Sequence, residues 1–345
     1  MKKILALMLL LFSLEGACAC EFRSAPGAFQ LPDCMLQDGN FTQLDALAEH
    51  YRQGNVRDTD GAQKIARFYE SLGADENDGD MHTEPSPAWE NRARLIAKWK
   101  MAAPASITAK LAEATFFLRY GQYARGYYAS DRVSAAARQL HKERIAKALA
   151  LLEAMPGVAS KDPQWYGLAL EIGLAQEWTR QKFDAMYAKA IARFPDQLIY
   201  YYTAATFNSS RYFGSREQFN AYVESAVKTT EARMGQEMYT RLQFLRMSDD
   251  PIDWSRMKLG FDAILLRYPN NFTRNNYAKY ACEQGDYVTA NAQFDLAGTE
   301  RAMNIWKTPE RRERCVAWAK LHTRHGGQPS CVELVSGAWV ECTKK

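Results

Sequence analysis

The sequence has few histidines, no long apolar run beyond its first residues, and no excess of charge of one sign. Its 5 histidines leave little room for sites that need several imidazole groups. The formal net charge is +4, and basic residues alternate with acidic ones, as between Glu310 and Arg314. Because no basic stripe is available for a phosphate backbone, we do not expect nucleic acid as a partner.

Recognisable catalytic and cofactor motifs are also missing. The chain contains no nucleophile elbow, no phosphate-cradling loop and no dinucleotide fingerprint. The acidic stretch between Ala74 and Pro87 is rich in turn formers, but its glycine and final glutamate do not fall at calcium-loop spacing. We therefore expect no cofactor and no bound metal, and binding is favoured over enzymatic activity.

The first 19 residues have the layout of a secretory signal peptide. Lys2 and Lys3 precede the apolar run from Ile4 to Leu14, and small residues follow up to Ala19. The run covers 11 residues, and a membrane-spanning helix needs ~20. We predict cleavage after Ala19 and export to the periplasm or the medium.

Cleavage after Ala19 would make Cys20 the first residue of the mature chain. A cysteine at this position is also where a bacterial lipoprotein carries its lipid, so tethering to a membrane through Cys20 is the alternative to soluble export. Of the 7 cysteines in the sequence, cleavage removes Cys18 and leaves six. An even number in an exported chain predicts disulfides.

The C-terminal stretch from Cys331 to Cys342 predicts two short strands joined at Ser336-Gly337. A two-residue turn there pairs Val335 with Ala338, and counting outward brings Cys331 opposite Cys342. Opposed residues lie roughly 4.5 to 5.5 Å apart between Cα atoms, which a disulfide can bridge. The register therefore predicts a Cys331–Cys342 disulfide.

Elimination and proximity pair Cys282 with Cys315, and Cys20 with Cys34. Two alternatives stay open. Cys282 and Cys315 could be reduced core residues, because a free cysteine packs as a small hydrophobe. If Cys20 were lipidated, Cys34 would lack its partner.

The chain behind the signal is predicted in three parts. Residues 20–40 hold prolines and glycines without sustained periodicity and predict an extended lead-in. Residues 41–157 form an N-terminal helical region, in which apolar residues recur every three or four places, as in Phe41, Leu44 and Leu47. Residues 158–345 form helical repeats with a C-terminal cap.

The repeat is visible in the apolar positions of one helix and their recurrence. Six positions of this helix are matched 74 residues later. They are Phe183, Tyr187, Ala190, Ile191, Phe194 and Pro195, and their counterparts are Met257, Phe261, Ile264, Leu265, Tyr268 and Pro269. A shift of 36 residues gives Phe219, Val223, Ala226, Val227 and Thr230. A unit of ~34 to 40 residues with two helices and a closing proline is typical of tetratricopeptide solenoids. We predict an all-α, tetratricopeptide-like helical repeat (α-solenoid) with a small C-terminal β-hairpin.

Tyrosines and an arginine gather in the segment from residue 120 to residue 128, which we expect to interrupt the helical pattern because it holds two glycines. Both residue types offer large contact area with polar tips and are frequent anchors of binding surfaces. The alternative is half-buried packing, which is commoner for tyrosine in a helical repeat. We expect one of the three consecutive tyrosines at 200–202 to face a groove. The candidate binding residues are Tyr120, Tyr123, Arg125, Tyr127, Tyr128 and Tyr201.

A metal cluster of His322 and His325 with Cys315 and Cys331 is conceivable. A solvated last helical turn is the stronger interpretation, because histidine there favours the negative end of the helix dipole. No metal site is therefore predicted.

The chain resembles a bacterial family known only as domain of unknown function 4034. The resemblance implies a helical, tetratricopeptide-like fold and brings no catalytic residues. It covers most of the mature chain and rests on Phe41–Tyr51, Phe68–Leu72, Tyr120–Tyr128, and the stretch from Lys161–Tyr166 to Ala192–Asp196.

Two functions from different classes follow. The first is a scaffold that holds a protein or peptide in the bacterial cell envelope. The second is a hydrolase-like envelope enzyme that uses the Tyr120–Tyr128 cluster or the C-terminal histidines and cysteines. The first is favoured because no acid, base and nucleophile constellation is recognisable.

The export hypothesis predicts the mass of the mature protein. Mass analysis under non-reducing conditions should give a chain that begins at Cys20 without an attached lipid, with its cysteines oxidised in pairs. A chain that keeps Met1, or one whose first residue carries acyl groups, would contradict soluble export.

Overall fold

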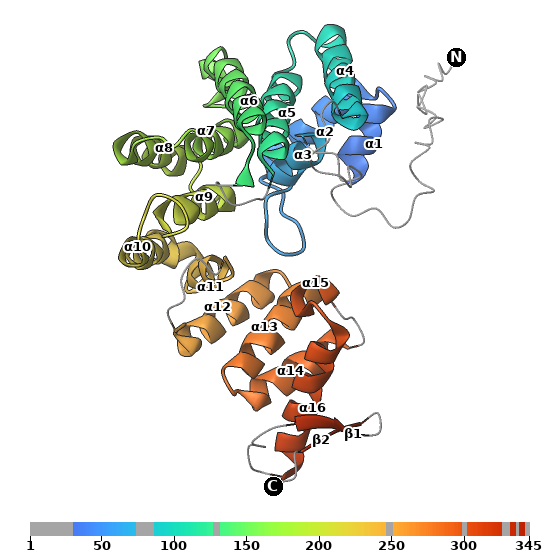
Figure 1. Ribbon diagram of the computed structural model, residues 1–345, viewed down its shortest axis with the longest axis vertical. Coiled ribbons are helices and arrows are strands. Elements are labelled where there is room, and N and C mark those ends of the chain that lie inside the picture. Colours follow the sequence, from blue (N-terminus) through green and yellow to red (C-terminus); the bar gives the residue numbers. More distant parts are fainter. Residues whose placement is uncertain are drawn as a thin grey trace, which may run out of the picture. The chain divides into compact units, whose positions relative to one another are not determined.

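The computed structural model describes residues 30–73, 86–126, 132–245, 251–298, 302–325, 332–335 and 338–341 (Figure 1). Helices make up nearly all of this part of the chain, which confirms the prediction of an α-helical fold. Contacts divide the chain into two compact units. The first comprises the residues up to Gly54 together with Arg67–Val158, and the second comprises Asn55–Ala66 and Ala159–Lys345.

The first unit is built from paired helices, and its largest contact joins α5 to α6. The helix α3 (Lys64–Gly73) begins in the second unit's segment and continues into the first. The other elements are α1 (Gln30–Gln37), α2 (Phe41–Gly54), α4 (Pro87–Ala102), α5 (Ile107–Arg125), α6 (Ala135–Glu153) and the 3-10 turn η3 (Pro156–Val158).

The prediction of an extended lead-in over residues 20–40 is wrong for Gln30–Gln37, which form α1. Pro32 lies in the first turn of this helix, where no backbone N–H is required. Leu36 is fully buried, and α1 packs on α2 and α4. Asp33 forms an ion pair with Arg92 of α4, whose guanidinium is buried. Tertiary contacts therefore stabilise a helix that its own short sequence does not indicate.

The predicted interruption at Tyr120 is also wrong, because α5 continues to Arg125 and ends only at Gly126. Gly121 lies within the helix, and a Cβ there would come 2.8 Å from Cδ1 of Ile145 in α6. The glycine thus allows two helix backbones to approach closely, and it does not break the helix. Gly126 supplies the break, with a φ of 64° that favours glycine.

The second unit follows the chain from α7 to the C-terminal strands (Figure 1). Each helix from α7 to α14 packs on the next, and α7 and α9 also contact α9 and α11 respectively. The elements are α7 (Pro163–Ala175), α8 (Arg180–Arg193), α9 (Leu198–Asn208), α10 (Arg216–Met234), α11 (Glu237–Gln243), α12 (Trp254–Arg267), α13 (Asn271–Glu283), α14 (Tyr287–Ala297), α15 (Met303–Trp306), α16 (Pro309–His325), β1 (Val332–Val335) and β2 (Ala338–Glu341).

Local sequence sets where these helices begin and end. Side-chain oxygens of Asp162, Thr179 and Asp253 accept hydrogen bonds from the first-turn backbone N–H groups of α7, α8 and α12. The helices α8 and α12 end at Phe194 and Tyr268, and the backbone angles φ and ψ of these two residues differ by less than 10°. A proline follows each of these residues and excludes the helical conformation before it.

The repeat offsets of the sequence hold in the structure. Phe183, Phe219 and Met257 occupy α8, α10 and α12, and all three are 0% exposed. Ala190, Ala226 and Ile264, each about two turns further on, are also buried. The same helical face is therefore turned inward in each of the three helices.

The strands β1 and β2 pair antiparallel, and Val335 lies opposite Ala338. The next pairs outward are Leu334 with Trp339, Glu333 with Val340, and Val332 with Glu341. Cys331 and Cys342 lie outside the described residues, so the disulfide between them stays a prediction.

Phe261 offers a test of the repeat core. Its ring is fully buried and stacks on Tyr277, with centroids 4.3 Å apart. Phe261→Ala should lower the free energy of unfolding by about 3–5 kcal/mol, because it leaves a cavity. Leu266 lies on the same helix and is 85% exposed, so Leu266→Ala should change stability by less than about 0.5 kcal/mol. Urea unfolding measures both, and equal losses would contradict the inward register.

Candidate functional site

The predicted binding cluster of tyrosines is largely packed inside the first unit. Tyr120 lies between Trp89, with ring centroids 4.9 Å apart at 11°, and the guanidinium of Arg144, whose carbon is 3.3 Å from the ring centroid. Tyr123 is 8% exposed, and its ring centroid is 5.2 Å from that of Trp89. These two tyrosines are brought together, and they hold α4, α5 and α6 in contact.

Of the remaining members of the cluster, the structure describes Arg125, which is partly buried. Arg125 donates a hydrogen bond to the carbonyl oxygen of the adjacent Gly126, at 3.2 Å. Tyr127 and Tyr128 lie outside the described residues. The packing alternative therefore accounts for the part of the cluster that the structure describes.

Tyr201, the sixth candidate, is a core residue of the second unit. Its ring is 0% exposed, and its hydroxyl donates to the carbonyl oxygen of Pro195 at 2.8 Å. Burial raises the pKa of this phenol above its ordinary value, so it stays a protonated donor. Tyr200 is equally buried, and only Tyr202 of the three consecutive tyrosines is partly exposed.

A pocket of about 560 Å³ lies among α13, α15 and α16 of the second unit. Lys279, Cys282 and Glu283 line it from α13, with the three- and four-residue spacing of one helical face. Arg311, Arg314, Cys315 and Trp318 line it from α16 with the same spacing, and Trp306 comes from α15. The volume falls in the range of about 300–1,000 Å³ that is usual for small-molecule and side-chain pockets.

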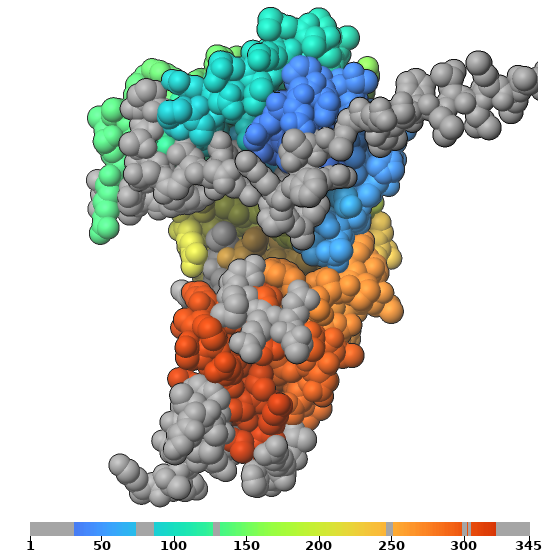
Figure 2. Space-filling view, turned by 90° about the vertical axis from the view of Figure 1, so that its right-hand side faces the viewer, coloured from blue at the N-terminus to red at the C-terminus, as the bar shows by residue number. Residues whose placement is uncertain are grey.

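The predicted Cys282–Cys315 disulfide is present and joins the two walls of this pocket. The Cα atoms of the two cysteines are 6.0 Å apart. Cys315 is buried in a small core together with Ala278, Phe294 and Ala319. Both pocket helices are thus fixed to one another covalently and by burial, which keeps the pocket walls in place. In Figure 2 the orange and red helices α12 to α16 pack closely against one another.

Two tryptophans supply the aromatic surface of the pocket. Trp306 is 3% exposed, and its indole N–H donates to Oδ1 of Asn275 at 2.9 Å, which fixes the ring. Trp318 is partly exposed and meets Tyr287 edge-on, with centroids 6.4 Å apart. One ring is therefore held rigidly while the other presents area to a ligand.

The pocket lining combines basic, acidic and aromatic side chains with the disulfide. The cysteines are oxidised and carry no thiol nucleophile. Within the ranges that the structure describes, no group of three or more His, Cys, Asp or Glu residues could hold a metal ion. His322 and His325 belong to α16, and their side chains lie outside the description. Cys34 is disulfide-bonded, and its predicted partner Cys20 is not among the described residues.

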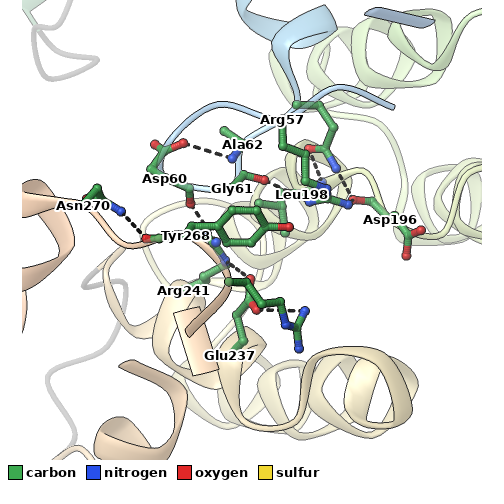
Figure 3. A network of polar contacts seen from close by, with 12 residues as sticks. Arg57, Asp60, Gly61, Ala62, Asp196, Leu198, Glu237, Arg241, Tyr268 and Asn270 are labelled. Atoms are coloured by element: carbon green, nitrogen blue, oxygen red, sulfur yellow. Dashed lines mark hydrogen bonds and ion pairs between the residues drawn. The ribbon is translucent and has the colours of Figure 1, made fainter. Parts of the chain in front are cut away.

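A second group of polar contacts, which the sequence did not predict, is made by the segment Asn55–Ala66 (Figure 3). This segment, called the 55–66 loop below, ends in the first residues of α3. This 55–66 loop closes on itself, because the backbone N–H groups of Asp58 and Lys64 donate to the carbonyls of Ala62 and Val56. Figure 2 shows its blue surface lying directly against the orange helices of the same unit. The loop therefore belongs to the second unit, although it lies in the sequence between the two segments of the first unit.

One end of the 55–66 loop binds the turn between α8 and α9. Arg57 and Gln63 both donate side-chain hydrogen bonds to the carbonyl oxygen of Asp196, the first at 3.3 Å. Gln63 also accepts from the backbone N–H of Leu198 at 3.2 Å. The buried amide of Gln63 therefore takes the place of a backbone hydrogen-bonding partner for this turn.

The other end binds the turn between α12 and α13. Asn270 donates to the carbonyl oxygen of Thr59 at 3.0 Å, and Arg241 donates to that of Asp60 at 2.8 Å. Asp196 and Asn270 are 74 residues apart, which is the repeat offset. The loop therefore bridges two equivalent turns of the repeating pattern (Figure 3).

Only one signal in the sequence points to this loop. Asp60-Gly61 is a turn dipeptide, and Gly61 has a φ of +85°. Most of the hydrogen bonds that hold the loop are accepted by backbone carbonyl oxygens, which every residue has. The sequence therefore contains no residue pattern that predicts these hydrogen bonds.

Comparison with protein-family models, with curated proteins and with solved structures found no match to this chain. None of the described helices combines the length and the apolar composition that crossing a bilayer requires.

Gly61 tests the docking of the 55–66 loop. A Cβ on Gly61 would lie 2.6 Å from Nη2 of Arg241 and 2.7 Å from the ring of Tyr268. Gly235 also has a positive φ, +55°, but nothing lies within 4 Å of its added Cβ. Gly235→Ala should cost about 1 kcal/mol of stability from backbone strain alone. Gly61→Ala should cost roughly 2–4 kcal/mol, because strain and overpacking add.

Thermal or denaturant unfolding measures the two glycine variants. Hydrogen exchange should also show faster exchange of the backbone N–H groups of Leu198 and Lys64 in the Gly61→Ala protein alone. Equal losses of stability in the two variants would show that the loop does not pack against Arg241 and Tyr268.

Proposed function

We propose that this chain is an exported helical-repeat protein that acts as a protein- or peptide-binding scaffold in the bacterial cell envelope. The pocket among α13, α15 and α16 is the observation that carries the proposal. It combines a partly exposed tryptophan, Trp318, with basic side chains on a disulfide-linked pair of helices. Aromatic and arginine side chains on a rigid support are the usual anchors of protein recognition.

The arrangement of helices supports a tetratricopeptide-like α-solenoid, in which the strands β1 and β2 act as a C-terminal cap. Neighbouring helices pack in chain order, and the inward positions recur at the sequence offset. Solenoids of this kind serve as binding surfaces, because stacked repeats form an extended face. The resemblance to the domain of unknown function 4034 family points to the same architecture.

Export is supported by the oxidised cysteines. A disulfide between Cys282 and Cys315 persists in an oxidising compartment and is rare in the cytosol. The disulfide bond at Cys34 is what the pairing with Cys20 requires. If Cys20 is the partner of Cys34, its sulfur is not available for the thioether of a lipoprotein, and export without a membrane tether follows.

The alternative of an envelope hydrolase has less support. Tyr120 and Tyr123 are held by Trp89 and Arg144 in helix packing, where they meet no substrate. Cys315 is committed to a disulfide, which removes it from a catalytic or metal-binding group with His322 and His325.

Photo-cross-linking in the source bacterium tests the scaffold function. Trp318→p-benzoylphenylalanine places a photoreactive aromatic group in the pocket, and Leu266→p-benzoylphenylalanine places the same group on an exposed site of α12 outside it. Irradiation should give a discrete protein or peptide adduct at position 318 and none at position 266. The absence of an adduct at 318, or the same adducts at both positions, would contradict the proposal.

A further inference from the structure

The charge of the α13–α16 pocket selects the kind of ligand that it can hold. Its lining contains three basic side chains, Lys279, Arg311 and Arg314, and one acidic side chain, Glu283. The surplus is positive, although the whole chain is nearly balanced. A concave site with low-dielectric walls focuses such a field toward a ligand inside it. The pocket therefore favours a group of negative charge.

The two arginines are placed to bind an oxyanion. Arg311 and Arg314 are three residues apart on α16, so they project from the same face of the helix. A guanidinium group offers a planar pair of N–H donors that matches the two oxygens of a carboxylate. Because the disulfide fixes α16 against α13, Lys279 stays on the opposite wall of the same pocket.

The tryptophans extend the recognition beyond the charge. The indole of Trp306 is locked by its hydrogen bond to Asn275, and Trp318 presents a partly exposed ring beside the arginines. The volume of about 560 Å³ is far larger than an inorganic ion needs. A ligand that fills the pocket thus carries an apolar or aromatic group next to its negative charge.

We propose that the pocket binds an acidic peptide segment in which a carboxylate side chain stands beside an aromatic one. The inference rests on the proposed scaffold function and names the ligand class of the same site. Arg311 and Arg314 hold the carboxylate, and the partly exposed ring of Trp318 packs on the aromatic side chain.

Fluorescence anisotropy with the purified, oxidised protein tests this ligand class. The probe is fluorescein-labelled Gly-Gly-Asp-Glu-Phe-amide, and its matched control is Gly-Gly-Asn-Gln-Phe-amide, which has the same shape without the carboxylates. The acidic probe should bind about tenfold more tightly, because it makes charged hydrogen bonds that the control cannot make.

Arg311→Glu and Lys320→Glu form a matched pair of protein variants. Both residues are exposed on α16 and both changes reverse one charge, but only Arg311 lines the pocket. Arg311→Glu should weaken binding of the acidic probe by about tenfold or more, as the loss of a charged hydrogen bond implies. Lys320→Glu should leave the affinity nearly unchanged, and circular dichroism should show both variants folded.

Three outcomes would overturn the proposed ligand class. These are equal affinity for the two probes, equal weakening by the two protein variants, and displacement of the probe by inorganic phosphate at concentrations similar to those of the unlabelled peptide. If the cross-link at position 318 forms while the charge dependence is absent, the scaffold function stands and the acidic ligand is wrong. If neither is found, both are wrong.

Discussion

The buried carboxylate of Glu237 is the constraint on which the second unit depends. It is 0% exposed, and it pairs with Nε of Arg241 at 2.7 Å and with Nη1 of Arg267 at 3.3 Å. A carboxylate without access to water is tolerated only when cations and hydrogen bonds compensate for its lost hydration. Arg241 is buried as well, and its remaining N–H groups need acceptors, one of which is the carbonyl of Asp60. The short helix α11, the end of α12 and the 55–66 loop are thereby coupled through one ionised side chain (Figure 3).

Much of the helical pattern could be predicted from the sequence, because apolar period and helix ends are local properties. The offsets linking Phe183 with Phe219 and Met257 place buried residues correctly, and each of the three lies on a helix. The errors arise where distant contacts outweigh local signals. Helix α1 depends on contacts with α4. The 55–66 loop depends on hydrogen-bond partners more than a hundred residues away: the carbonyl oxygen of Asp196 accepts from the loop, and Arg241 and Asn270 donate to it.

The candidate site was harder to predict, because a side chain's role depends on neighbours that the sequence does not place. Composition made Tyr120 and Tyr123 look like binding residues, yet Trp89 and Arg144 enclose them from other helices. The pocket shows the opposite case. The spacing of its residues on α13 and α16 is present in the sequence, but only the contact between the two helices turns two ordinary faces into one cavity.

The disulfide between α13 and α16 makes the structure of the pocket depend on the oxidation state of Cys282 and Cys315. The two cysteines are separated by 33 residues, so the bond removes a large loop-closure entropy from the unfolded C-terminal region. Before oxidation, α16 packs against α13 without a covalent link, and its arginines share no covalent frame with Lys279. In the proposed scaffold, the bond therefore completes the pocket. If the chain is exported as proposed, its pocket is loosely assembled in the reducing compartment where the chain is made and is completed in an oxidising one.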